Sequence, residues 1–183
     1  MKMLVHRTAI NGVPPFELAD IKLHARVDGG EEDAAIMRMA WTACHEIEQF
    51  AQIALLHQTI RVTIFDPPVQ SSLRLPIGPV LDDAPVTVTV DAAPCTAFVL
   101  EPGQRPYLRW LAAFYDLPHP SRLTIEYRAG FGARESDVPR DLAQAIADQA
   151  TLHYDGRSPM NARDLTTSPH MARIGARYRG VSL

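Results

Sequence analysis

The side chains best suited to metal binding or catalysis are seven histidines and two cysteines, and their spacing predicts no metal site. The histidines form no HxxxH, HxH or HExxH pattern; they are His6, His24, His45, His57, His119, His153 and His170. Zinc centres need convergent ligands of that kind. Cys44 and Cys95 form no CxxC pair, so we expect both to be small buried residues rather than zinc ligands or disulfide partners.

A glycine-rich segment, AGFGA at 129–133, is superficially similar to a nucleotide-binding loop. It lacks the third glycine, the surrounding β-α-β pattern and the Lys-Ser/Thr pair of such loops, so a strand-to-helix turn explains it better. The sequence also contains no G-x-S-x-G motif, Walker motif or paired-carboxylate signature. We therefore predict no catalytic residues, no cofactor and no metal. An enzyme would need a deep pocket with convergent polar groups.

The clearest element is a helix expected over residues 31–56. Its apolar side chains recur every three or four positions and draw one stripe along a single face, at Ile36, Ala40, Ala43, Ile47, Phe50 and Ala54. Polar residues off the stripe, including Glu46 and Glu48, are expected to face water. Acidic residues at 31–33 favour a helix start there, because they meet the positive end of the helix dipole.

Two further helices are expected on either side of a strand-rich region. A short helix follows Pro14 and Pro15, over about 16–25, and a second long helix covers about 137–154 with Leu142 and Ile146 on its apolar face. His153 follows that face, and we expect it to be a hydrogen-bonded residue at the edge of the core. A short helix over 169–177 is also compatible with the sequence.

Between the helices, the hydrophobic period changes from 3.6 to 2, which is typical of strands. Alternating or β-branched runs separated by turn residues predict strands at 59–66, 72–77, 86–91, 95–101, 107–111 and 122–129. Connections this short favour antiparallel hairpins. The predicted fold class is therefore α+β: a small helical bundle with an inserted antiparallel β-meander or sandwich and an extended C-terminal arm.

The charge distribution divides the chain at residue 156. Residues 157–183 hold five arginines and one aspartate, a net charge of +4, whereas residues 1–156 carry −7 of the total charge of −3. We expect one domain over 1–156, with helices at about 15–57 and 137–154 and the β insertion at about 59–129, followed by a basic arm. Because the arm has several helix breakers and little apolar material, we expect it to be weakly ordered in the free protein. It is either a solvated tail or an arm for an acidic partner surface or DNA.

The chain has no apolar run of signal-peptide length near its start and no apolar window long enough to span a membrane. A soluble, cytoplasmic product is expected.

The order and spacing of several segments resemble the head-tail connector (adaptor) proteins of long-tailed phages and of the phage-derived particles called gene transfer agents. The similar segments are HARVD with the acidic helix start at 24–33, LRLPIGPV at 73–80, EYRAGFG at 126–132 and VPRDLAQAI at 138–146. The resemblance covers roughly residues 10–157. The C-terminus differs: residues 157–183 are longer than the corresponding ending of many relatives, and only ARYRGV at 176–181 is loosely similar to it.

The resemblance implies a non-enzymatic structural protein that forms a ring, nominally of twelve copies, under the capsid portal. Its implied partners are the portal protein, neighbouring copies of itself and the next connector or stopper protein on the tail side, with DNA passing through the channel. It implies assembly in the cytoplasm, followed by residence in the neck of the particle.

The basic tail supplies the candidate partner-contact residues, which are Arg173, Ile174, Arg177, Tyr178 and Arg179. If the segment is helical, Arg173 and Arg177 lie one turn apart, and so do Ile174 and Tyr178. We expect these residues to contact an acidic rim of the portal. The alternative hypothesis is a nucleic-acid-binding or regulatory protein acting through its arginine-rich tail.

Overall fold

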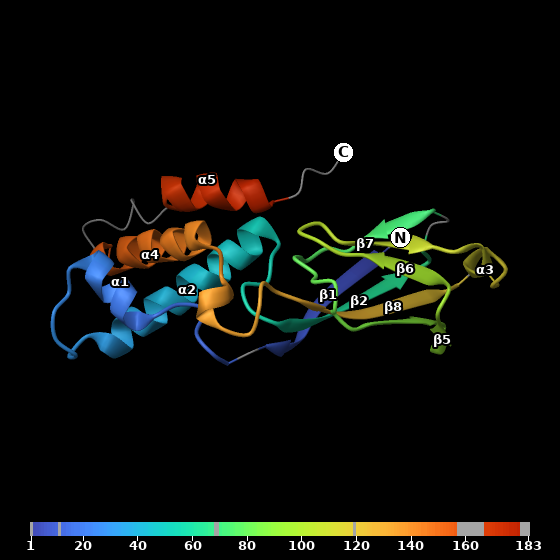
Figure 1. Cartoon of the computed structure of the whole chain (residues 1–183), viewed down its shortest axis with the longest axis horizontal. Helices are drawn as coiled ribbons and strands as arrows, with labels where there is room; N and C mark the ends of the chain where they lie inside the picture. Colours follow the sequence, from blue (N-terminus) through green and yellow to red (C-terminus); the bar gives the residue numbers. More distant parts are fainter. Residues whose placement is uncertain (1, 11, 68–69, 119, 157–166, 180–183) are drawn as a thin grey trace. The chain divides into compact units, whose positions relative to one another are not determined.

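The computed structural model describes residues 2–10, 12–67, 70–118, 120–156 and 167–179. Within these ranges the chain forms five α-helices and eight strands arranged in two antiparallel sheets (Figure 1), which confirms the predicted α+β class. The strands and helices gather into two compact units. A β unit comprises residues 1–11 and 57–131, and a helical unit comprises residues 12–56 and 132–183.

The β unit contains a five-stranded and a three-stranded sheet. The first has the order β1 (Lys2–Ile10), β2 (Gln58–Phe65), β8 (Arg122–Ala129), β4 (Val86–Val90) and β5 (Ala93–Cys95). The second has the order β3 (Ser72–Arg74), β7 (Tyr107–Trp110) and β6 (Phe98–Glu101), and a short helix, α3 (Ala112–Tyr115), follows β7. The predicted strand at 95–101 is thus two short strands in different sheets.

The strand order of the larger sheet is not that of a simple meander, because the last strand, β8, lies between β2 and β4. Ile125 of β8 is opposite Val62 on one side and Val88 on the other. All three side chains are buried, as the alternating pattern predicted. Tyr127, also on β8, donates its hydroxyl proton to the Ile77 carbonyl at 3.0 Å, and burial raises its pKa.

Strand β1 was not predicted. It pairs with β2 from Lys2 opposite Phe65 to Ile10 opposite Gln58, with an irregularity in the pairing between Arg7 and Ala9. Over residues 2–9 none of its side chains is buried. Residues 2–10 show no period-2 alternation, because Met3, Leu4 and Val5 are consecutive apolar residues.

The helical unit is built from α1 (Leu18–Ala25), α2 (Asp33–Ala51), a short 3-10 helix η1 (Glu135–Asp137), α4 (Arg140–Asp155) and α5 (Pro169–Tyr178). Helix α2 packs against α1, α4 and α5. Four of the stripe residues are buried on it as predicted, namely Ile36, Ala40, Ala43 and Ile47. Phe50, the fifth, is only half-buried.

Helix α2 ends at Ala51 rather than near residue 56, and the reason lies in Glu48. The side chain expected to face water is only 6% exposed, and its carboxylate oxygen accepts a hydrogen bond from the Leu55 amide at 2.8 Å. Gln52 takes the left-handed conformation with φ of 56°, so the chain turns and buries residues 53–56 outside the helix. The prediction for Glu48 was wrong, because sequence periodicity does not reveal a side chain that caps the end of its own helix.

Both cysteines are free and buried. Burial, with a smaller contribution from the Glu48 carboxylate, raises the pKa of the Cys44 thiol well above its ordinary value. A protonated, inaccessible thiol is a packing residue rather than a nucleophile. No helix within the described ranges is both long and apolar enough to cross a membrane.

The basic tail differs from the weakly ordered arm expected from the sequence. Residues 169–178 form α5, which packs on α2 and α4 and buries Met171, Ile174 and Gly175. Residues 157–166 and 180–183 lie outside the described residues; they include Arg157, Arg163 and the last two residues of the ARYRGV segment. The order of α5 follows from burial of Met171 and, one turn later, of the adjacent Ile174 and Gly175, a pattern too short to stand out against the polar residues around it.

Candidate partner-contact surface

The start of α5 is fixed by Ser168. Its hydroxyl accepts a hydrogen bond from the Met171 amide at 3.0 Å, which is an N-cap, and Pro169 fills the first helical position. The Ser168 amide in turn donates to the Gln149 side-chain oxygen on α4 at 2.7 Å, and both residues are buried. The first turn of α5 is therefore held by specific hydrogen bonds as well as by packing.

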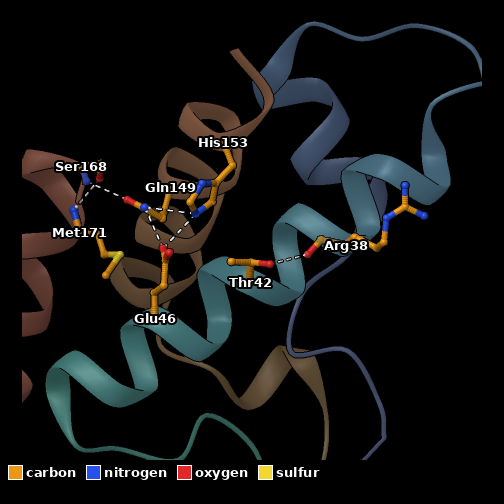
Figure 2. Close-up of polar contacts among 7 residues, drawn as sticks. All are labelled: Arg38, Thr42, Glu46, Gln149, His153, Ser168 and Met171. Atoms are coloured by element: carbon orange, nitrogen blue, oxygen red, sulfur yellow. Dashed lines mark hydrogen bonds and ion pairs between the residues drawn. The ribbon is translucent and has the colours of Figure 1, made fainter. Parts of the chain in front are cut away.

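Gln149 continues this connection to α2, as Figure 2 shows. Its amide nitrogen donates to the Glu46 carboxylate at 2.8 Å, and the same carboxylate oxygen lies 2.9 Å from the His153 Nε2. His153 is half-buried and bonded, as expected for a residue at the edge of the core. The result is a polar network across α2, α4 and the N-cap of α5, in which buried polar groups satisfy one another.

The middle of α5 lies very close to α2. A Cβ atom built at Gly175 would lie 2.6 Å from Cδ1 of Phe50, so only glycine allows this approach. Ile174 is 2% exposed, and Met171 is equally buried one turn before Gly175. The Phe50 ring therefore lies against α5 at Gly175, although Phe50 itself is only half-buried.

The C-terminal end of α5 is held by the side chains of Tyr178, its last residue, and Arg179, which follows it. The Tyr178 hydroxyl donates to the Asp141 carboxylate on α4 at 2.9 Å, and the Arg179 guanidinium lies 5.5 Å from the Phe50 ring centre. Desolvation, together with the bond to Asp141, raises the pKa of Tyr178 to about 12. These contacts turn both side chains toward the helical unit.

The five sequence-predicted contact residues thus separate into two groups. Ile174 is buried and Tyr178 is bonded to α4, so neither presents its side chain to a partner in this fold, and Arg179 is exposed but lies against Phe50. Arg173 and Arg177 are exposed, and they lie one helical turn apart on the outer side of α5. The outer surface of α5, defined here by Arg173, Ala176 and Arg177, is the part of the segment open to a partner.

Asp148 on α4 is a contact point that the sequence spacing did not reveal. Its carboxylate lies 2.8 Å from His24 Nε2 on α1 and is also bonded to His170 Nδ1 on α5. The two histidines are 146 positions apart and follow no motif. Only the packing of α1 and α5 on either side of α4 brings them together, so no signal in the sequence could have paired them. The contact between His170 and Asp148 adds a further polar attachment of α5 to the unit.

No cluster of three or more His, Cys, Asp or Glu side chains among the described residues could hold a metal ion. A cavity of about 390 Å³ in the β unit is lined mainly by apolar and aromatic side chains, among them Trp110, Phe114 and Leu117. Its polar lining comes from Gln70, Ser72 and Tyr115, and the described residues that line it include no Asp, Glu, His, Lys, Arg or Cys.

Comparison with known proteins finds no matching family model and no matching curated protein. Solved structures do match. A chain in the neck of an empty gene transfer agent (GTA) particle, computed with C6 symmetry, superposes with a TM-score of 0.78 and 27% identity, over 98% of this chain and 97% of that one. A chain in the neck of a native GTA particle, computed with C12 symmetry, gives 0.76 and 26% with the same coverage.

A chain in the virion of a native GTA particle gives a TM-score of 0.75 and 28% identity, again over 98% and 97% of the two chains. The resemblance to head-tail connectors of gene transfer agents is confirmed. The likeness extends over both units and α5, and is not limited to the segments quoted from the sequence.

Proposed function

We propose that this protein is a structural component of the neck of a phage-like particle, and more specifically a head-tail connector (adaptor) that forms a ring under the capsid portal. The observation that carries the proposal is the full-length similarity to chains of GTA necks, with a TM-score of 0.78 at 27% identity. The ring would link the DNA-filled head to the tail, with DNA passing through its channel. Twelve copies, assembled in the cytoplasm before joining the particle, are the expected arrangement.

Several properties of the described residues support a structural role. Three histidines of the helical unit contact carboxylates on other helices: His24 and His170 at Asp148, and His153 at Glu46. The thiol of Cys44 is buried and protonated. The related neck structures were computed with C6 and C12 symmetry, which is the kind of cyclic arrangement a ring protein needs.

The outer surface of α5 is the proposed contact with the portal. Arg173 and Arg177 present two guanidinium groups on one side of a helix that is itself fixed to the unit, so no backbone has to be ordered when they bind. Guanidinium groups in this arrangement suit an acidic protein surface, where they form charge-assisted and bidentate hydrogen bonds. The portal protein is the proposed partner for this surface, and the tail-side connector or stopper binds elsewhere.

Deletion of the gene tests the proposed function. Heads that carry a portal should still fill with DNA, but they should fail to retain tails or DNA, and electron microscopy of purified particles would show this directly. Normal tailed particles after deletion would contradict the proposal, and so would loss of capsid shells.

A paired charge reversal tests the portal contact. Arg173→Glu with Arg177→Glu should weaken binding to purified portal severalfold, whereas Arg38→Glu, an exposed arginine on α2, serves as the matched control. Unchanged portal binding by the double variant would move the contact to another surface. Sequence-dependent DNA binding that the double variant abolishes would instead favour the nucleic-acid alternative.

A further inference from the structure

The free edges of the two sheets differ greatly in length. The larger sheet ends in β1, with nine residues, and β5, with three residues that include Pro94. The smaller sheet ends in β3, with three residues, and β6, with four. Proline has no N–H to donate, and very short strands offer few bonds, so β5 and β3 are poor templates for another strand. The edges that remain are β1 and β6.

Along the first half of strand β1, Lys2 is the single charged residue, and Met3, Leu4 and Val5 that follow it are apolar. Among the described residues it pairs with β2 alone, and its irregular pairing begins only after Arg7. Leu4 and Val5 are each 38% exposed, and because they are consecutive they lie on opposite faces of the sheet. A long, regular and partly apolar edge is a site for pairing with another chain.

Strand β6 complements this edge residue by residue. In an antiparallel pairing with β1 of another copy, Glu101 of β6 would lie opposite Lys2 of β1. The next three positions would pair apolar residues with apolar residues: Leu100 with Met3, Val99 with Leu4, and Phe98 with Val5. All four residues of β6 are half-exposed, and β6 pairs with β7 alone among the described strands. Opposite charges and apolar pairs in this alignment favour the register.

We propose that β1 of one copy adds to the free edge of β6 in a neighbouring copy, joining the β units of adjacent subunits. This inference rests on the proposed ring. Since the two edges belong to different sheets of the same chain, the contact is heterologous and can repeat around an axis. Pairing of β1 with β1 would be isologous and would yield a dimer instead, as would pairing of β6 with β6.

Cysteine pairs placed across the predicted register test the contact in purified particles. Leu4→Cys with Val99→Cys, and Met3→Cys with Leu100→Cys, put the two thiols directly opposite each other on one face. One of the two pairs must be the closer, non-hydrogen-bonded pair, in which Cβ atoms are about 4.5–5.5 Å apart and a disulfide can form. The matched control, Leu4→Cys with Leu100→Cys, is offset by one residue, so its thiols lie on opposite faces. The native cysteines are buried.

After mild oxidation, a non-reducing gel should show chains linked into multimers severalfold more strongly for at least one aligned pair than for the offset control. Equal linking by all three variants, or none by the aligned pairs in particles that contain the chain, would overturn the inference and leave the proposed function intact. Particles that assemble normally without the chain would overturn the proposed function, and the ring contact with it.

Discussion

Helix α5 and strand β1 are the last and first elements of the chain, and the sequence patterns predicted α5 only weakly and β1 not at all. The two elements differ in how far their side chains are buried in their own units. Helix α5 buries Met171 and Ile174, and its backbone contacts Phe50 at Gly175. Strand β1 buries none of its described side chains, although it pairs along β2. The difference teaches that an ordered terminal segment can be part of a core or a surface for assembly, and that burial distinguishes the two. Substitutions in α5 should therefore affect folding, and those in β1 should affect contacts between copies.

The largest expected effect is at Ile174. Because this side chain is 2% exposed, Ile174→Ala should lower the free energy of unfolding by about 2–5 kcal/mol, as other large-to-small changes in cores do. Chemical denaturation would measure it. Arg173→Ala, one position earlier and exposed, is the matched control and should change little. Equal and small effects of both substitutions would show that α5 is an accessory to the helical unit rather than part of its core.

Sequence periodicity predicted those helices and strands whose apolar residues recur with a clear period. It did not predict features that depend on contacts between residues far apart in the sequence. The stripe at Ile36, Ala40 and Ile47 is buried as expected. The end of α2 was misplaced because the Glu48 carboxylate bonds to the Leu55 amide beyond the helix. The position of β8 between β2 and β4 could not be foreseen, since strands of similar composition can pair in several orders.

Only part of the candidate partner-contact surface could be predicted from the sequence. One-turn spacing indicated correctly that Arg173 and Arg177 share a side of a helix. It could not show which side packs inward, because Ile174 and Tyr178 looked equally suitable as anchors for a partner. The role of Tyr178 depends on Asp141, more than 30 positions away, and burial of Ile174 depends on the packing of α5 against α2 and α4. That Arg173 and Arg177 contact a portal stays a prediction.

A second, smaller effect is expected at Gly175. An added methyl group would lie 2.6 Å from the Phe50 ring, and such overpacking costs about 1–3 kcal/mol, of which the higher helix propensity of alanine offsets about 1 kcal/mol. Gly175→Ala should therefore destabilise the native protein modestly. In a Phe50→Ala background the clash is absent, and Gly175→Ala should be neutral or stabilising. Thermal melting of the four proteins would measure the coupling. Additive effects would show that α5 can shift away from α2 without loss.

The third effect is a pH dependence at Tyr178. Its pKa is raised to about 12 in the folded protein, from about 10 in an unfolded chain, because desolvation and Asp141 favour the neutral phenol. The resulting stabilisation is fully present below pH 10 and is lost as the pH rises toward 12. Tyr178→Phe should therefore lose less stability than the native protein over that range, measured by denaturation at a series of pH values. Tyr127 titrates in both proteins and cancels in the difference. Identical pH profiles would show that the bond to Asp141 does not form in solution.

The smallest change in stability is expected on β1, at Leu4. Threonine is β-branched and therefore suits a strand, and Leu4 is 38% exposed, so Leu4→Thr should alter the free energy of unfolding by no more than about 0.5 kcal/mol. Val62→Thr is the matched comparison in the adjacent strand. Val62 has no exposed surface, and a hydroxyl buried there without a partner costs about 1–3 kcal/mol.

If denaturation showed Leu4→Thr to be as damaging as Val62→Thr, β1 would belong to the core and its contrast with α5 would disappear. If Leu4→Thr leaves the free energy of unfolding unchanged but lowers the amount of the chain incorporated into particles, the exposed apolar residues of β1 act between copies. A side chain that adds little to the stability of its own fold can be retained for the contact that it makes with another chain.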